Sequence, residues 1–187
     1  MIQDIFKVGV YWVDLDLNTK AVSDYCISYS KKNKSRQVSN VGGYHSEPLQ
    51  CENPVLNDLF LEIEKHTNLY SQSLGFTSKG VFDTVWININ GYKDYNAEHQ
   101  HPHCRLSGVY YAKTPTDCGD ITFFAPHFDV LVSNWWNLGC TTQYTFQEYK
   151  MPAVENRLYI FPNWLRHMVD PNLNKKEKRI SISFNLD

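Results

Sequence analysis

The sequence predicts a mainly β fold, either a sandwich or a barrel, with one flanking helix. Segments rich in β-branched and aromatic residues follow one another through the second half of the chain, and prolines and glycines separate them. The expected strands cover residues 81–90, 106–113, 120–125, 141–149, 157–161 and 179–186. Many short strands with few helices are typical of sandwiches and barrels. Residues 5–17 add one or two strands, and residues 30–50 are expected to form a loop.

The one helix is expected between Asn53 and Gly75. Asn53 is a good N-cap, Pro54 suits the first helical position, and Gly75 suits the stop. One apolar stripe then recurs at three- and four-residue steps. It consists of Val55, Leu56, Leu59, Phe60 and Ile63, and it continues loosely to Leu69 and Tyr70. We expect this stripe to pack against a sheet.

The length and charge of the chain limit its class. Its 187 residues fit one domain, which we expect over residues 1–187. Residues 1–80 would supply N-terminal strands, a loop and the supporting helix, and residues 81–187 the β core. The net charge is −2 and the pI about 6.4. A nucleic-acid-binding protein usually carries a basic excess, so the charge argues against that class.

The cysteines indicate a reducing compartment. There are five, an odd number, and no CxxC pair occurs, which argues against a disulfide framework and a zinc knuckle. We therefore expect a cytoplasmic protein. No apolar run is long enough to span a membrane, and the acidic start does not resemble a signal peptide. The apolar helix could pack on its own sheet or on a second copy, so a homodimer stays open.

A histidine cluster is the first candidate for chemistry. His99, His101 and His103 lie in the stretch Glu98-His99-Gln100-His101-Pro102-His103. If this stretch is extended, His99 and His101 point the same way and form half of a metal site. Pro102 would tend to end the ladder there, so His103 is the weaker ligand candidate. The alternative is an exposed strand whose histidines bind nothing.

His167 is the candidate for a third ligand. It follows the apolar segment 157–161 and the turn at Pro162-Asn163. A histidine placed after a strand and a turn can reach a site formed earlier in the chain. The alternative is an ordinary surface or core histidine.

The polar face of the last expected strand suggests a ligand that would bind beside a metal. Residues 179–186 alternate between an apolar face and a polar face that carries Arg179, Ser181, Ser183 and Asn185. A solvent-facing strand gives this pattern, but so does a barrel whose interior binds a polar ligand. Arg179 and Ser181 would project together, which suits the capture of a carboxylate. A metal with open positions beside such an arginine is the layout that a keto acid needs.

These segments resemble the Fe(II)/2-oxoglutarate oxygenase superfamily, and more narrowly a family of small 2-oxoglutarate oxygenases of bacteria and phages. The resemblance runs from about residue 38 to the end of the chain. The motifs that carry it, besides Ser39-Asn40-Val41-Gly42-Gly43-Tyr44, are His99-Gln100-His101-Pro102, Leu106-Ser107-Gly108-Val109-Tyr110-Tyr111, Gly119-Asp120-Ile121-Thr122-Phe123, the segment 158–167 and Arg179-Ile180-Ser181-Ile182-Ser183-Phe184-Asn185. Each motif is weak alone, but their combined order is specific.

The resemblance implies a double-stranded β-helix, the cupin-like jelly roll, with one iron site. His99, His101 and His167 would ligate Fe(II). The residues implied for binding 2-oxoglutarate are Arg179 and Ser181 at its distal carboxylate, with Tyr111 and, more weakly, Asn88. The implied reaction uses O2, hydroxylates a C–H bond of an unidentified small molecule or peptide side chain, and releases succinate and CO2.

One position departs from the wider superfamily. Most members place a carboxylate two residues after the first histidine, but here that position is His101. Asp83, Asp94, Glu98, Asp120 or His103 could then complete the site instead. Two other functions stay open: a cupin-like three-histidine metalloenzyme without a keto acid, and a non-catalytic β-sandwich binding module.

Aromatic residues are the candidates for a pocket lining. They are Trp86, Trp135, Trp136, Tyr144 and Phe146, although ordinary core packing explains most of them equally well.

Overall fold

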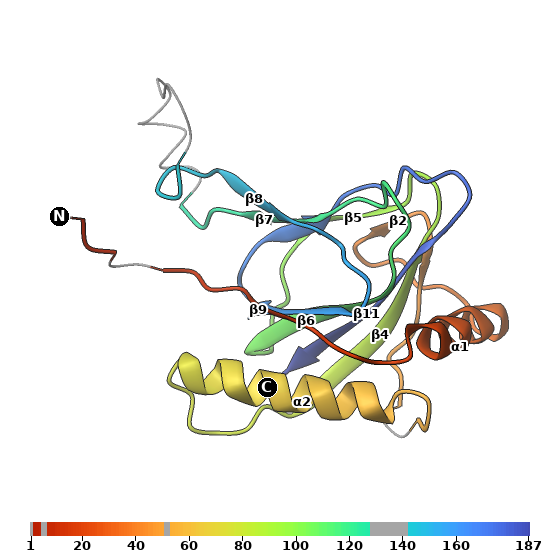
Figure 1. Cartoon of the computed structure of the whole chain (residues 1–187), viewed down its shortest axis with the longest axis horizontal. Helices are drawn as coiled ribbons and strands as arrows, with labels where there is room; N and C mark the ends of the chain where they lie inside the picture. Colours follow the sequence, from red (N-terminus) through yellow and green to blue (C-terminus); the bar gives the residue numbers. More distant parts are fainter. Residues whose placement is uncertain (1, 5–6, 51–52, 128–141) are drawn as a thin grey trace.

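Two antiparallel sheets face each other in the computed structural model, which describes residues 2–4, 7–50, 53–127 and 142–187 (Figure 1). The six-stranded sheet has the order β1-β9-β6-β11-β4-β3, and the five-stranded sheet the order β2-β5-β10-β7-β8. The strands are β1 (Tyr11–Asp14), β2 (Asn40–Val41), β3 (Tyr44–His45), β4 (Phe82–Asn90), β5 (Tyr95–His99), β6 (Leu106–Lys113), β7 (Ile121–Phe124), β8 (Glu148–Met151), β9 (Arg157–Pro162), β10 (His167–Val169) and β11 (Arg179–Leu186). From β4 to β7, and again from β8 to β11, the chain changes sheet at every step. This winding is the double-stranded β-helix, so the predicted fold is confirmed.

Most expected strands form close to their predicted bounds, and two, β6 and β11, match them. The prediction of a strand over residues 141–149 was wrong, because β8 covers only Glu148–Met151. Thr142 and Thr145 close a turn before it, since the amide of Thr145 donates to the carbonyl of Thr142 at 2.9 Å. The expected loop at 30–50 contains the short strands β2 and β3.

An N-terminal helix, α1 (Thr19–Lys32), was not predicted. Asn18 caps it, because its side-chain oxygen accepts from the amide of Ala21 at 3.0 Å. Only Val22, Ser23 and Cys26 are buried on it. So narrow a contact face leaves little hydrophobic periodicity in the sequence, which explains the omission.

The predicted helix forms as α2 (Asn57–Ser73), whose N-cap Leu56 lies three residues after the predicted cap Asn53. Asn53 caps a turn instead, because its side-chain oxygen accepts from the amide of Val55 and its carbonyl from that of Leu56. The central stripe residues Leu59, Phe60 and Ile63 are buried as predicted. Leu56 and Tyr70 are buried as well, whereas Val55 and Leu69 are exposed, so the prediction was wrong for those two residues.

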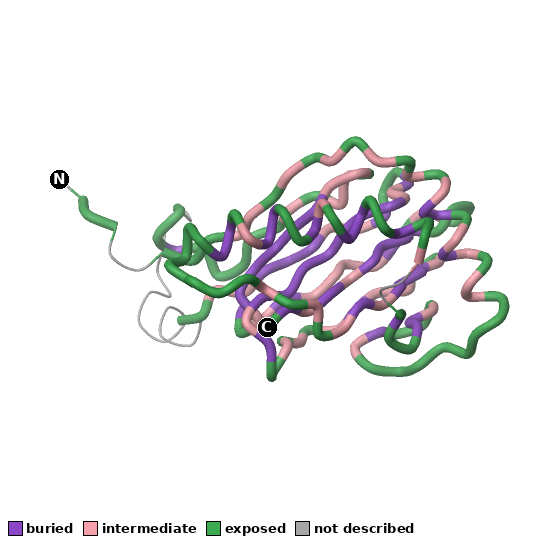
Figure 2. Tube along the Cα trace, turned by 90° about the horizontal axis from the view of Figure 1, so that it is seen from below, coloured by how far each residue is buried: buried purple, intermediate pink, exposed green. Residues whose placement is uncertain are grey.

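Both helices cover the outer face of the six-stranded sheet (Figures 1 and 2). The main core lies between the two helices on one side and the six-stranded sheet on the other. It includes Ile87, Tyr110, Ile160, Ile182 and Phe184 of the sheet. A second, smaller cluster, centred on Phe123, Tyr159 and Phe161, lies in the space between the sheets. The rest of that space is lined by polar side chains. The fold thus places its larger apolar core outside the jelly roll and leaves part of the interior for a site.

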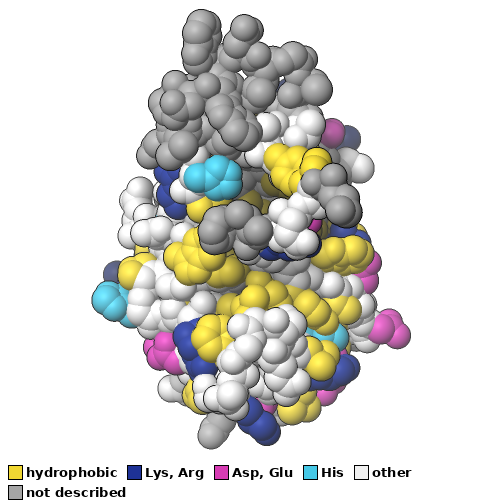
Figure 3. Space-filling model, turned by 90° about the vertical axis from the view of Figure 1, so that its left-hand side faces the viewer, with side chains coloured by type: hydrophobic (Ala, Val, Ile, Leu, Met, Phe, Trp, Pro, Cys, Tyr) yellow, Lys and Arg dark blue, Asp and Glu magenta, His cyan; other side chains and the backbone are white. Residues whose placement is uncertain are grey.

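One side of the molecule carries a band of apolar side chains (Figure 3). A pocket separate from the histidines is lined by Val8, Val10, Phe123, Phe146 and Tyr149 among others. No helix in the described ranges is long and apolar enough to cross a membrane.

Candidate active site

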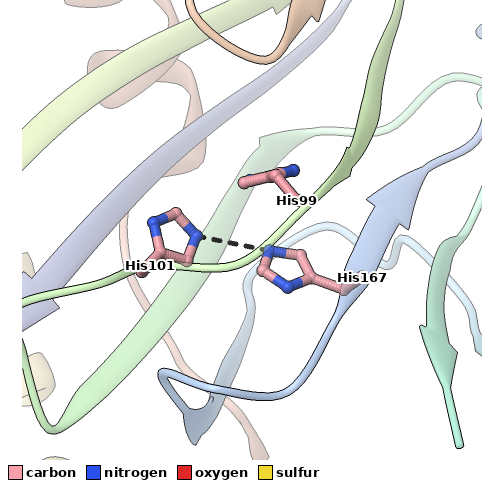
Figure 4. A group of neighbouring side chains, drawn as sticks. All are labelled: His99, His101 and His167. Atoms are coloured by element: carbon pink, nitrogen blue, oxygen red, sulfur yellow. Dashed lines mark hydrogen bonds between the residues drawn. The ribbon is translucent and has the colours of Figure 1, made fainter.

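Three histidines from two strands and a loop meet between the sheets (Figure 4). His99 ends β5, His167 begins β10, and the two residues pair directly across these neighbouring strands. His101 follows β5 in the loop that leads to β6. One ring nitrogen from each of the three lies within 4.8 Å of the others. The structure therefore brings together the three predicted metal ligands.

Backbone carbonyls orient two of the three rings. Nδ1 of His99 lies 2.7 Å from the carbonyl oxygen of Ala97, and Nδ1 of His167 lies 2.9 Å from that of Leu165. Each Nδ1–H donates to its carbonyl, which leaves Nε2 without a proton and available to a metal. Nε2 of His101 lies 3.3 Å from Nε2 of His167 (Figure 4). Because Nε2 of His167 carries no proton, Nε2 of His101 donates to it.

Burial keeps the cluster uncharged. It lowers the pKa of His101 to about 3, with His99 and His45 adding repulsion. Burial also lowers the pKa of His99 and places that of His167 well below its usual value. At neutral pH all three imidazoles keep a lone pair for a metal.

No carboxylate belongs to the cluster among the residues that the structure describes. Asp94 instead accepts from the amide of Gly91 at 2.7 Å, and Glu98 pairs with Arg166 at 2.8 Å. His103 also lies outside the cluster and is exposed. The donor set is therefore three neutral imidazoles.

Arg179 is a buried cation beside this interior. Its side chain is only 1% exposed, and no described carboxylate forms an ion pair with it. Nη1 donates to the carbonyls of Cys118 and Asp170. Nε and Nη2 have no partner in the described part of the chain. Burial lowers the pKa of Arg179, but a guanidinium remains charged at neutral pH.

Further buried polar groups near Arg179 also lack partners. The hydroxyl of Tyr111 and the side-chain oxygen of Asn88 make no hydrogen bond to the described residues. Both residues pair with Ser181 of β11, from β6 and β4 on its two sides. An unsatisfied buried polar group costs about 1–3 kcal/mol. A carboxylate ligand, which accepts several hydrogen bonds, fits the unpartnered donors of Arg179 and Tyr111.

Two cavities adjoin the histidines. The narrower one lies between the sheets, and His99, His101, His167, Asn88 and Ser181 are part of its lining. Our sequence reasoning missed two further polar members, Asn90 and Asn96, and it named Ser39 and Ser183 without assigning them to the site. Asn90 carried a signal, because it falls on the same strand face as Asn88.

The second cavity is an open cleft of about 400 Å³ that also reaches His99 and His101. Trp86 lines both cavities, as expected of it, and His45, which we did not predict, lines the cleft. Tyr144 and Phe146 line neither in the described part of the chain. Trp135 and Trp136 lie outside the described residues.

Comparison with known proteins identifies the family. Residues 84–185, more than half of the chain, match the family described as "Putative 2OG-Fe(II) oxygenase". The chain belongs to this family. Its cofactor is therefore Fe(II), its co-substrate is 2-oxoglutarate, and the protein is an oxygenase. No curated protein matches the chain in sequence.

Solved structures share the fold of this oxygenase. A prolyl-4-hydroxylase from Pseudomonas putida is 13% identical with a TM-score of 0.68, over 96% of this chain and 92% of that chain. A viral collagen prolyl hydroxylase from Paramecium Bursaria Chlorella virus-1, as a 2OG complex, is 13% identical with a TM-score of 0.62, over 95% and 94%. HygX from Streptomyces hygroscopicus, with nickel and 2-oxoglutarate bound, is 9% identical with a TM-score of 0.61, over 96% and 82%.

Proposed function

We propose that His99, His101 and His167 hold Fe(II) in this oxygenase, and that Arg179 and Ser181 bind the distal carboxylate of 2-oxoglutarate. Tyr111 and Asn88 are proposed as further contacts to the co-substrate. The observation that carries the proposal is the convergence of three neutral imidazoles within 4.8 Å. Imidazole nitrogen is a common ligand of iron, and this donor set leaves other coordination positions for a chelating keto acid.

The unpartnered groups support the co-substrate assignment. Arg179 offers two free N–H nitrogens and Tyr111 one free hydroxyl, all buried. Asp170 and Asp120 partly offset the buried charge of Arg179 from a distance, but no described carboxylate pairs with it directly. A dianionic ligand would provide that direct partner. The neighbour that holds nickel and 2-oxoglutarate adds support from the same fold.

In the proposed reaction, iron and 2-oxoglutarate supply the oxidation of a substrate C–H bond by O2, with succinate and CO2 as the other products. The chain's own residues bind and orient. The histidines would hold the metal at the boundary of the two cavities. The co-substrate would lie between the sheets, near Ser181 and Asn88 of the narrower cavity's lining, with Arg179 two residues before Ser181 on the same face of β11. Phe123 and Phe161, whose rings lie 6.0 and 4.6 Å from that of His167, help to keep water out.

The open cleft is the proposed route for the substrate, because it reaches His99 and His101 from outside. Two fold neighbours are named as prolyl hydroxylases, so a peptide side chain is one candidate substrate, and a small molecule is the other. We also keep a cytoplasmic location, inferred from the cysteines, and a homodimer as predictions. Cys26, Cys104 and Cys118 are free thiols, which fits a reducing compartment.

The test is anaerobic visible spectroscopy of the metal-free protein with Fe(II) and 2-oxoglutarate. Bidentate binding of the keto acid to Fe(II) gives a weak charge-transfer band without any substrate. We expect the band only when both are added, and we expect its loss in His167→Ala and Arg179→Ala. His103→Ala is the matched control, because this exposed histidine lies two residues past His101 and outside the cluster.

Two outcomes would overturn the proposal. Iron binding without a band would mean that the three histidines hold a metal but no chelating keto acid. An absence of iron binding, or a band that survives His167→Ala, would mean that the metal is not held by this cluster.

A further inference from the structure

His101 is held differently from the other two histidines. His99 and His167 lie in paired strands, and a backbone carbonyl fixes each ring. His101 lies between β5 and β6, outside both strands. No described group other than His167 bonds to its ring nitrogens. Something else must therefore fix its position if it serves as a ligand.

Asn163 fixes the backbone of His101. The amide of His101 donates to the carbonyl of Asn163 at 3.0 Å, and Nδ2 of Asn163 donates back to the carbonyl of His101 at 2.9 Å. The amide of Asn163 also donates to the carbonyl of Arg105 at 3.2 Å. Asn163 itself lies in the turn between β9 and β10, four residues before His167. One residue thus ties the loop of His101 to the turn that delivers His167.

Trp86 supports the ring of His101. The two ring centroids lie 5.7 Å apart and the planes are tilted by 41°. His45 packs on Trp86 in turn, at 5.7 Å and 15°. His45 is buried, and its Nδ1 lies 3.0 Å from the carbonyl oxygen of Ser46, so it forms a fixed support. The ring of His101 therefore packs against Trp86, which His45 in turn holds in place.

We infer that Asn163 and Trp86 are positioning residues for His101, the first through its backbone and the second through its ring. The inference rests on the proposed function, because it takes His101 as a metal ligand. For His99 and His167, hydrogen bonds from Nδ1 to backbone carbonyls orient the ring in the same way. Loss of such an outer partner typically weakens metal affinity about 10-fold to 100-fold.

The experiment measures the binding of Co(II) alone to the metal-free protein by calorimetry and visible absorption. Co(II) d–d bands report the number and geometry of the ligands, so they respond to a displaced His101. In Asn163→Ala we expect an affinity loss of about 10-fold and altered bands. Asn163→Asp should show the same direction of change, because its carboxylate cannot donate to the carbonyl of His101.

For the ring contact we compare two replacements of Trp86. Trp86→Leu removes the aromatic support, and we expect about a 10-fold loss of Co(II) affinity with altered bands. Trp86→Phe keeps a ring and should restore most of the affinity and the wild-type bands. A merely structural role would not produce this rescue together with the spectral change.

Matched controls separate positioning from stability. Asn156 also bridges distant segments, since its Nδ2 donates to the carbonyl of Leu17 and its side-chain oxygen accepts from the hydroxyl of Tyr110. Asn156→Ala should lower the thermal unfolding temperature but leave the Co(II) affinity unchanged. Trp12→Leu, at a half-exposed tryptophan of β1 that packs against Arg157, should leave the Co(II) affinity unchanged.

The outcomes distinguish the inference from the function that it assumes. If His167→Ala binds Co(II) as the wild type does, the proposed metal site itself fails. If His167→Ala loses binding but the Asn163 and Trp86 variants keep wild-type affinity and bands, only the positioning inference is overturned.

Discussion

The two faces of the six-stranded sheet differ in role: the outer face packs against the helices, and the inner face lines the candidate active site. On β11, the outer face carries Ile180, Ile182, Phe184 and Leu186 against the helices, and all four are at most 1% exposed. The inner face of the same strand carries Arg179, Ser181, Ser183 and Asn185. The outer groups need only burial, whereas on the inner face two nitrogens of Arg179 are buried without a partner among the described residues. The comparison teaches that one strand can supply stability on one side and a binding wall on the other.

The largest expected effect is on the outer face. Phe184→Ala should lower the free energy of unfolding by about 3–5 kcal/mol, because a fully buried ring leaves a cavity. Denaturant unfolding measures it. Leu61→Ala, at a position that is 64% exposed, is the control and should change stability by less than about 0.5 kcal/mol. Equal losses in both variants would contradict the division between the faces.

The next effect is on the inner face. Arg179→Met should weaken 2-oxoglutarate binding to the Ni(II)-loaded protein about 100-fold, since hydrogen bonds to a charged group contribute about 1.5–3 kcal/mol. Calorimetric titration measures the affinity. The free energy of unfolding should change little, because removal of the buried charge offsets the loss of its hydrogen bonds to the carbonyls of Cys118 and Asp170. Retained affinity would show that Arg179 does not bind the co-substrate.

A pH dependence should arise on the helix-facing side. Burial raises the pKa of the Cys26 thiol from 9.0 to about 12. The folded state disfavours the thiolate, whereas the unfolded state does not. The contribution of the protonated thiol to the free energy of unfolding is therefore fully present below pH 9 and is lost as the pH rises through 12. From pH 8 to 10.5 the wild type should lose about 2 kcal/mol more than Cys26→Ala does. Parallel losses in urea unfolding would show that Cys26 ionises as easily in the folded state.

The smallest effect tests the neighbour of Arg179. Ser181→Ala should weaken 2-oxoglutarate binding by about 5-fold, as expected for the loss of one hydrogen bond of about 1 kcal/mol. Ser107→Ala is the control on the inner layer, because that hydroxyl already donates to Asn185 at 2.9 Å. The same titration compares them, and an equal loss in both would remove Ser181 from the proposed contacts.

Local patterns in the sequence were enough to predict part of the molecule. The strict alternation of β11 predicted its two faces, and the spacing of His99 and His101 predicted a shared direction. The stripe at Leu59, Phe60 and Ile63 predicted α2. In each case residues two to four positions apart decide which side a chain segment buries, and that information is local.

Only the tertiary structure decided the rest. His101 and His167 are 66 residues apart in the chain. The pairing of β5 with β10 brings their Nε2 atoms to within 3.3 Å of each other. Asn163 and His45 had no local signal, because each acts on a residue from a distant element. The existence of α1 depended likewise on packing against the sheet, because only a narrow face of this helix is buried. Periodicity determines which face is buried, but contacts between distant segments decide what meets there.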